Sequence, residues 1–217
     1  MRFKAVCFDL DGTLLDTLDD IAYCANKILS KRGYPIHRVD EFRYFVGDGS
    51  KMLMARALPS EHRNEALIEE CRKDFENLYR ECWKRQTLPY KFIPELLNSL
   101  SKLDLKLAIL SNKPQEFTLL TVDHLLQDWD FEAVLGQREG VPKKPDPTGM
   151  LEISQQLRIS SDDFLYLGDT ATDMKTAIGA GCYPVGVLWG FRTEKELKDS
   201  GAQAIIKNPL DVLSLIN

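Results

Sequence analysis

The sequence predicts an α/β fold, in which a parallel sheet with helices on both faces carries an inserted all-helical block. Short apolar runs alternate with helical stretches, at residues 3–8 and again from residue 106 onward. A strand–helix–strand repeat of this kind builds a parallel sheet. Residues 17–87 differ, because their apolar side chains recur only at helical spacing. Together the two patterns predict a sheet domain interrupted by a helical one.

The first apolar run, residues 3–8, is short and ends at Asp9, as is typical of a buried parallel strand. Helices are expected further along, for example over 115–126 and 147–157. Pro94 suits the first turn of a helix that returns the chain to the sheet. The other runs expected as strands of this Rossmann-like parallel sheet are 106–110, 133–135, 164–167, 183–187 and 204–206.

We expect an α/β catalytic core domain from residues 1–16 and 88–217, and a helical cap domain from residues 17–87. The connections between them are expected at 15–19 and 86–92. An insertion at the carboxyl end of a strand lies over the crevice where open α/β sheets bind ligands. The helical block is therefore placed to act as a lid.

Composition and charge narrow the class of protein. Apolar residues make up 44% of the 217 residues and charged residues 28%, the balance of an ordinary globular protein. We find neither a membrane span nor a signal-peptide core, and expect a cytoplasmic protein without membrane partners. The net charge of −5 and scattered basic residues argue against nucleic acid as a partner. Five cysteines without a close pair argue against disulfides and a zinc site. Monomer and homodimer both remain open.

The string D-L-D-G-T places Asp9 and Asp11 just beyond the first strand. Both carboxylates can turn toward one crevice, because Gly12 lets the chain bend sharply. Chance supplies such a D-x-D-G-T string in roughly one of a thousand chains of this length. The alternative is an acidic turn with capping side chains.

Two later strands also lead into polar residues that could belong to the same site as Asp9. The second core strand leads into Ser111 and Asn112, and the fourth leads into Asp169 and Asp173. These side chains converge on Asp9 if the first strand lies between the second and the fourth. Taken singly the signals are weak, since Asp173 could simply cap the following helix and Ser111 could be a polar strand end.

Lys144 precedes Pro145, and the residue before a proline is held extended. Pro147 can begin the next helix. We therefore expect Lys144 to be presented from a stiffened loop, with a solvated surface lysine as the alternative. Its neighbour Lys143 suits the solvated interpretation better.

The charges of the candidate site residues do not balance. Asp9, Asp11, Asp169 and Asp173 carry four negative charges, and Lys144 returns one positive charge. Two carboxylates about 4 Å apart repel by roughly 4 kcal/mol at an effective dielectric constant near 20. A divalent cation would offset this repulsion, and all-oxygen ligands favour Mg²⁺.

These four elements, in this order, resemble the signatures of the haloacid dehalogenase superfamily, from Phe3 to about Ile206. The resemblance implies that Asp9 is the nucleophile and forms an aspartyl-phosphate, and that Asp11 is the general acid and base. It also implies that Ser111 and Lys144 bind the phosphoryl oxygens, and that Mg²⁺ is bound by Asp9, Asp169 and the backbone carbonyl of Asp11. Asp173 would support the metal site indirectly, without binding the ion itself. The superfamily's dehalogenases lack an acid at the position of Asp11, so dehalogenation is disfavoured.

Within that superfamily the sequence is most similar to phosphoglycolate phosphatases. The similarity lies in the glycine pair Gly47 and Gly49 and in the segments 180–187 and 189–191. The resemblance suggests Gly47, Gly49 and Asn112 as further substrate-binding residues. A plain turn between two cap helices is the alternative. The basic residues that could meet a substrate carboxylate are Arg43, Lys51 and Arg56, and the sequence does not select among them.

We therefore expect a Mg²⁺-dependent phosphoric monoester hydrolase whose partner is a small-molecule phosphate ester, phosphoglycolate first. A phosphosugar mutase similar to β-phosphoglucomutase and a pyrophosphatase of the same superfamily are the alternatives. A non-catalytic binding protein is disfavoured, because every catalytic position is filled.

Overall fold

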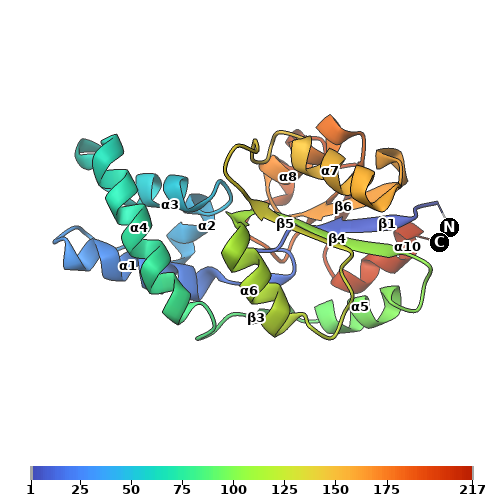
Figure 1. The fold of residues 1–217 in the computed structure, drawn as a ribbon, viewed down its shortest axis with the longest axis horizontal. Helices are drawn as coiled ribbons and strands as arrows, with labels where there is room; N and C mark the ends of the chain where they lie inside the picture. The colour runs from blue at the N-terminus through green and yellow to red at the C-terminus, as the bar shows by residue number, and fades with distance from the viewer. Residues whose placement is uncertain (1, 217) are drawn as a thin grey trace.

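The computed structural model describes residues 2–216 and contains a six-stranded parallel sheet with helices on both faces (Figure 1). The strand order is β5-β4-β1-β6-β7-β8. β1 therefore lies between β4 and β6, the order that the convergence of the polar strand ends requires. The strands are β1 (Ala5–Phe8), β4 (Lys106–Pro114), β5 (Ala133–Gln137), β6 (Phe164–Gly168), β7 (Tyr183–Val187) and β8 (Ala204–Ile206). The predicted fold class is confirmed.

The side chains of β1 alternate between two hydrophobic clusters, as expected of a strand covered on both faces. Val6 and Phe8 pack with α5 (Ile93–Leu100), α6 (Gln115–Leu125) and α10 (Val212–Ile216). Ala5 and Cys7 pack with α7 (Thr148–Leu157) and α8 (Ala171–Ala180). These two helix groups lie on opposite sides of the sheet in Figure 1. The remaining core helix, α9 (Glu194–Asp199), connects β7 to β8.

β4 is longer than expected, because it continues through Ser111, Asn112 and Lys113 to Pro114. Its register with β5 shifts between Leu110 and Pro114. An irregularity of this kind re-aims side chains at a strand end. It lies where β4 approaches the end of the sheet that faces the helical insertion.

The insertion contains α1 (Leu18–Lys31), α2 (Phe42–Phe45), α3 (Ser50–Ala57) and α4 (Glu65–Cys82), and lies beyond one end of the sheet (Figure 1). The four helices share a hydrophobic cluster, to which Phe117 and Phe191 of the core also belong. Short antiparallel strands, β2 (Leu15–Asp16) and β3 (Leu88–Pro89), pair where the chain enters and leaves it. The division into a core of 1–16 and 88–217 and a cap of 17–87 remains our proposal.

Buried Asp20 ties the two connections together. Its carboxylate accepts hydrogen bonds from the backbone amides of Gln86 and Thr87 and from the Thr87 hydroxyl, at 2.8–3.1 Å. Hydrogen bonds to a buried carboxylate are strong, and this arrangement holds α1 beside the return strand.

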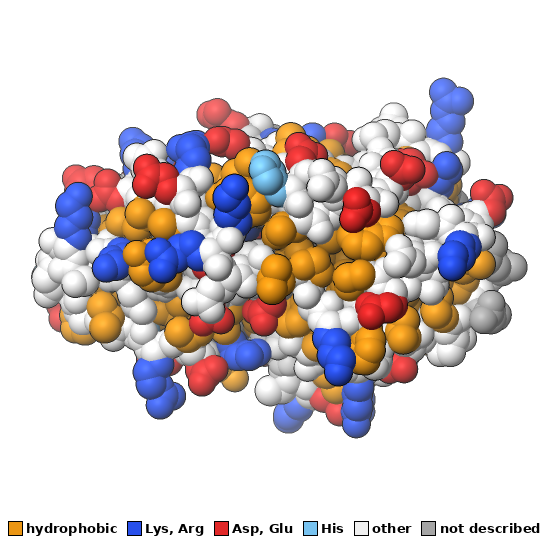
Figure 2. All heavy atoms as spheres, turned by 90° about the horizontal axis from the view of Figure 1, so that it is seen from below, with side chains coloured by type: hydrophobic (Ala, Val, Ile, Leu, Met, Phe, Trp, Pro, Cys, Tyr) orange, Lys and Arg blue, Asp and Glu red, His pale blue; other side chains and the backbone are white. Residues whose placement is uncertain are grey.

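No helix within residues 2–216 is long and apolar enough to span a bilayer. Figure 2 shows basic and acidic side chains interspersed on the face seen from below, around hydrophobic side chains near its middle.

Candidate active site

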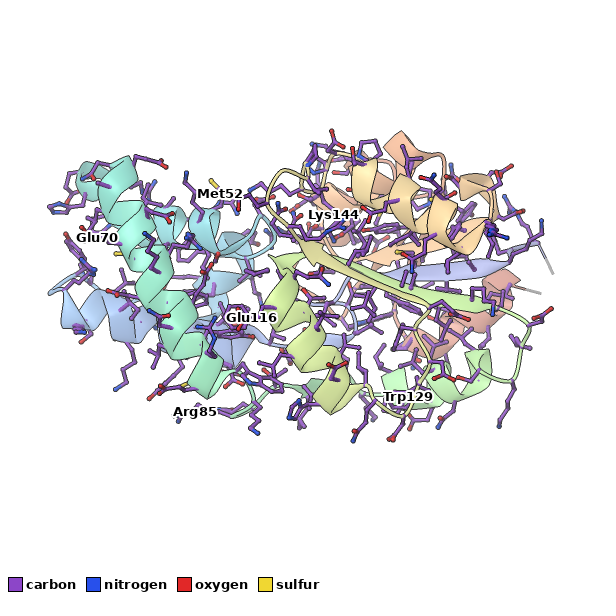
Figure 3. The ribbon with its side chains drawn as sticks, in the orientation of Figure 1. Met52, Glu70, Arg85, Glu116, Trp129 and Lys144 are labelled. Atoms are coloured by element: carbon purple, nitrogen blue, oxygen red, sulfur yellow. The ribbon has the colours of Figure 1, made fainter. Side chains whose placement is uncertain are left out.

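The predicted site residues come together where the carboxyl ends of β1, β4 and β6 face the helical cap. Asp9 follows β1, Ser111 lies in β4 and Asp169 follows β6. Lys144 is presented at the same end of the core (Figure 3). A pocket of about 540 Å³, its open mouth included, lies between this end and the cap. Its lining residues are Asp9, Asp11, Ile21, Val46, Gly47, Gly49, Ser50, Leu53, Phe75, Tyr79, Ser111, Asn112, Lys113, Pro114 and Phe117.

The tight turn after β1 depends on Gly12, whose φ is +87°. A Cβ at this position would collide with the carboxylate of Asp169 and the ring of Phe191. Glycine is therefore required both for the backbone conformation and for the close approach of the β1 and β6 loops. This agrees with the sharp bend expected between Asp11 and Thr13.

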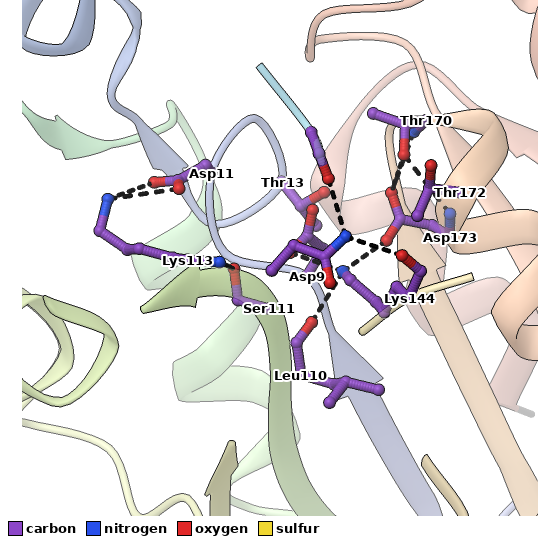
Figure 4. Close-up of polar contacts among 12 residues, drawn as sticks. Asp9, Asp11, Thr13, Leu110, Ser111, Lys113, Lys144, Thr170, Thr172 and Asp173 are labelled. Carbon is purple, nitrogen blue, oxygen red and sulfur yellow. Dashed lines mark hydrogen bonds and ion pairs between the residues drawn. The ribbon is translucent and has the colours of Figure 1, made fainter. Parts of the chain in front are cut away.

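Lys144 is at the centre of a buried ion cluster (Figure 4). Its Nζ lies 2.9 Å from Asp9 Oδ1 and 2.7 Å from Asp173 Oδ1, and it donates to the carbonyl of Leu110 at 2.9 Å. Burial disfavours its charge, but Asp173 and Asp9 outweigh that effect and raise the pKa of Lys144. Lys144 is 3% exposed, so the alternative of a solvated surface lysine is wrong.

The carboxyl groups in this cluster are strongly perturbed. Burial, aided by the charge of Asp173 and opposed by Lys144, raises the pKa of Asp9 to about 7. Burial and the charges of Asp173 and Asp9 also raise the pKa of Asp169 well above its usual range. Both shifts have the direction expected when carboxylates share a dry site with too little positive charge.

Asp169 and Asp173 are held by different partners. Asp169 accepts a hydrogen bond from the amide of Phe191 at 2.7 Å and one from the Thr13 hydroxyl at 3.4 Å. Asp173 accepts from the amide and hydroxyl of Thr170, at 3.1 and 2.6 Å, in a capping box that begins α8. The interpretation of Asp173 as a helix cap is therefore correct, and Asp173 also pairs with Lys144.

The residues present fit a divalent cation. Asp9, Asp169 and Asp173 each offer a carboxylate oxygen, and these oxygens lie within 4.8 Å of one another. Asp173 already uses its oxygens for Lys144 and Thr170, which leaves Asp9 and Asp169 better able to bind an ion directly. Burial and neighbouring negative charge raise the pKa values of both, and an ion with oxygen ligands, such as Mg²⁺, would offset that charge.

Asp11 belongs to a second ion cluster, which the sequence did not predict. Lys113 Nζ lies 2.9 and 3.2 Å from the two carboxylate oxygens of Asp11 and donates to the hydroxyl of Tyr79 at 2.8 Å. Figure 4 shows Asp11 pointing at Lys113, apart from the group around Lys144. Burial opposes the charge of Lys113, yet Asp11 and Tyr79 raise its pKa. Burial raises the pKa of Tyr79 to about 12. The one available signal was that Lys113 directly follows Ser111 and Asn112.

Ser111 and Asn112 lie between these two clusters in the pocket wall. The hydroxyl oxygen of Ser111 accepts from the amide of Lys113 at 3.2 Å. The amide nitrogen of Asn112 donates to the carbonyl of Gly47 at 2.9 Å and to that of Lys144 at 3.0 Å. Asn112 thus links the cap loop to the core, and its buried Oδ1 has no hydrogen-bond partner among the described residues.

The cap loop that contains Gly47 and Gly49 borders the pocket. Both glycines have positive φ values, +122° and +85°, which side chains rarely adopt. Lys143 donates to the backbone carbonyl of Asp48 at 2.6 Å, so this exposed lysine also joins the core to the cap loop.

The three basic candidates for a substrate carboxylate are engaged elsewhere. Arg43 donates to the carbonyl of Gly190 at 2.8 Å. Lys51 pairs with exposed Glu65, and Arg56 pairs with Asp48. None of the three lines the pocket.

Comparison with known proteins agrees with the resemblance seen in the sequence. A family profile described as haloacid dehalogenase-like hydrolase matches residues 6–187. A Vibrio parahaemolyticus protein named phosphoglycolate phosphatase is 27% identical over 98% of this chain and 96% of its own. One of the same name from Vibrio cholerae is 30% identical over 87% of this chain and 85% of its own.

The solved structures agree with the sequence relatives. A crystal structure from Lactobacillus delbrueckii subsp. bulgaricus, provisionally titled a phosphoglycolate phosphatase, has a TM-score of 0.92 and 27% identity. The match covers 100% of this chain and 99% of that one. The prediction of an enzyme similar to phosphoglycolate phosphatases is confirmed. With the polar ends of β1, β4 and β6 and the loop of Lys144 meeting under a helical cap, the chain belongs to the haloacid dehalogenase-like hydrolases.

Proposed function

We propose that this protein is a Mg²⁺-dependent phosphatase that hydrolyses a small phosphate monoester through an aspartyl-phosphate on Asp9. The observation that carries the proposal is the buried convergence of Asp9, Lys144 and Asp169 beneath the cap. A carboxylate can act as a covalent nucleophile when it is held in place and kept ionised. The ammonium group of Lys144, 2.9 Å from Asp9, holds this carboxylate in place and favours its ionised form against the effect of burial.

In the first step a carboxylate oxygen of Asp9 attacks phosphorus and the ester P–O bond breaks. The leaving oxygen takes a proton from Asp11. In the second step water attacks the phosphorus of the aspartyl-phosphate, Asp11 takes a proton from that water, and the bond to Asp9 breaks to release inorganic phosphate. General acid and base catalysis by one residue in successive steps is chemically consistent.

Other residues bind and orient the phosphoryl group. Lys144 and the hydroxyl of Ser111 supply positive charge and a donor for its oxygens. Mg²⁺, held by Asp9, Asp169 and the backbone carbonyl of Asp11 with Asp173 in support, would offset the negative charge of the carboxylates and the phosphoryl group. Exclusion of water by the cap strengthens these interactions.

Asp11 must turn to act as the acid. Its carboxylate is bound by Lys113, so it has to leave this contact and take up a proton, from water or from the phosphate monoester monoanion, before it can protonate the leaving oxygen. The cap side of the pocket is lined by the apolar side chains of Ile21, Val46 and Leu53.

Phosphoglycolate is our leading substrate, because relatives that match nearly the whole chain carry that name. A phosphosugar mutase would instead return the phosphoryl group from Asp9 to a sugar, and a pyrophosphatase would take a phosphoanhydride. Release of inorganic phosphate from a monoester without a phosphosugar activator distinguishes the phosphatase from the mutase. The cytoplasmic location and the oligomeric state stay predictions.

The test is phosphate release from a panel of phosphate esters and pyrophosphate, with Mg²⁺ and with chelator, on wild type and on Asp9→Asn. The amide has nearly the same shape but cannot attack phosphorus, so Asp9→Asn should fold normally and lose turnover. Folding is checked by circular dichroism. Activity of folded Asp9→Asn above a few per cent of wild type, or full wild-type activity in excess chelator, would refute the mechanism.

A further inference from the structure

Among the described residues that line the pocket, Lys113 is the one with a cationic side chain. It extends from the irregular end of β4, and its ammonium group reaches Asp11 of the core and Tyr79 of the cap. Much of the surrounding wall is apolar. The apolar cap side chains in this wall are Ile21, Val46, Leu53 and Phe75.

Lys113 is 7% exposed, so its charge cannot rely on bulk water. A buried charge is tolerated when a counter-charge and hydrogen bonds replace the lost hydration. In this structure the carboxylate of Asp11 supplies the counter-charge, and the Tyr79 hydroxyl supplies an additional acceptor.

Catalysis removes this counter-charge. When Asp11 turns to the leaving oxygen, Lys113 is left with the Tyr79 hydroxyl, which is neutral. An ester with an uncharged alcohol would leave the ammonium group unpaired at that moment. An ester with an anionic group on its alcohol would replace the carboxylate that has moved away.

We infer that Lys113 is a specificity-determining residue, which selects esters whose leaving alcohol carries an anionic group, such as the carboxylate of phosphoglycolate. This inference rests on the proposed function and adds the residue that recognises the alcohol. The carboxylate of Asp11, 2.9 Å from Lys113 Nζ, lies where that anionic group would bind. Lys113 therefore selects among esters in the step in which Asp11 protonates the leaving oxygen. Its ammonium group becomes available to the substrate when Asp11 turns away from it.

The other basic residues near the pocket do not provide an equal alternative. Arg43 and Arg56 are each held by acceptors of the protein, and Lys51 pairs with Glu65 on the exposed side of the cap. Lys51 is a matched control, because its removal deletes a positive charge from the same region without changing the pocket wall.

The experiment compares 2-phosphoglycolate with ethyl phosphate, in which a methyl group replaces the carboxylate. The measured quantity is the ratio of the two kcat/KM values, with Mg²⁺, for wild type, Lys113→Met, Lys113→Gln and Lys51→Met. The ratio from one preparation does not depend on the fraction of folded enzyme, so a partly unfolded variant remains informative. An effect on Asp11 alone would lower both values and leave the ratio unchanged.

We expect wild type to prefer 2-phosphoglycolate. Lys113→Met and Lys113→Gln should lower the ratio about 10- to 100-fold, the loss expected for one charge-assisted hydrogen bond to the substrate. Lys51→Met should keep the wild-type ratio.

Three outcomes would overturn the inference while leaving the phosphatase intact. They are a wild type without preference for 2-phosphoglycolate, Lys113 variants that keep the preference, and a Lys51→Met variant that loses it equally. If wild type releases phosphate from neither ester and not from p-nitrophenyl phosphate, the proposed function itself fails and the inference fails with it.

Discussion

Replacing Lys144 by Met should destabilise the protein strongly at alkaline pH in the absence of metal. The side chain is 3% exposed, and its ammonium group lies 2.7 Å from Asp173 and 2.9 Å from Asp9. Methionine fills a similar volume but leaves two buried carboxylates without their cation. Breaking a buried ion pair by removing one partner is costly, because the remaining charge is neither solvated nor paired.

The magnitude follows from the distances. At an effective dielectric constant near 20, each of the two contacts is worth about 6 kcal/mol of Coulomb attraction. The cost of dehydrating three charged groups offsets most of this, so the expected loss in the free energy of unfolding is about 3–5 kcal/mol. For a protein of this size, that loss corresponds to a decrease in Tm of about 6–20 °C.

The assay is urea or thermal unfolding of metal-free protein at about pH 8 and about pH 5. The loss should be smaller at the lower pH, because Asp9, whose pKa is raised to about 7, then carries a proton and needs no cation. Adding Asp173→Asn to Lys144→Met should restore part of the stability, since it removes one of the unpaired charges.

Lys143→Met is the matched control. Lys143 is exposed and its side chain donates a hydrogen bond to the carbonyl of Asp48, so loss of the ammonium group should cost less than about 1 kcal/mol. Equal losses for the two lysines, or a loss below about 1 kcal/mol for Lys144→Met at alkaline pH, would refute the account of the buried cluster.

Three further predictions concern catalysis, metal and the cap loop. Asp11→Asn should slow the hydrolysis of alkyl phosphates far more than that of p-nitrophenyl phosphate, whose leaving group needs no proton; equal losses in kcat would argue against the general acid. Because the folded protein binds the Asp9 proton more tightly than the unfolded chain does, the contribution of Asp9 to stability falls as the pH rises from about 4 to about 7. Mg²⁺ favours the ionised carboxylate and should therefore raise Tm more at about pH 8 than at about pH 5; equal shifts would contradict metal binding by Asp9. Gly49→Val should lower kcat/KM for 2-phosphoglycolate and ethyl phosphate together, because φ is +85° and a Cβ would lie 3.3 Å from the carbonyl of Asn112, which disturbs the closed cap; a loss confined to 2-phosphoglycolate would instead indicate recognition by the loop.

Much of the core could be predicted from local patterns. Apolar runs of strand length separated by helical stretches lead to a parallel sheet, and polar residues at the strand ends then share one edge. Asp9, Ser111 and Asp169 were predicted at this edge in this way, and Lys144 was predicted from the prolines that follow it. What the pattern left open was whether the ends converge, and this depended on β1 lying between β4 and β6.

The role of Lys113 could not be predicted from its position in the sequence. Residues in a regular strand alternate between faces, but the shifted register at the end of β4 changes where the side chains point. Its second partner, Tyr79, lies on a cap helix more than thirty positions away and reaches it because of how the cap sits on the core.

The amino-acid sequence by itself determined which acidic residues lie at the sheet edge, because a carboxylate pair after a strand and a glycine that permits a sharp turn are local properties of the chain. It also determined that a helical block would cover that edge. Only the tertiary structure decided which cation faces the pocket. Arg43, Lys51, Arg56 and Lys113 carry the same charge, but three of them pair with acceptors elsewhere, and burial against Asp11 leaves Lys113 in the wall. Which cation faces the pocket depends on the distances between charged groups and on their dehydration, and both arise when separate elements pack together.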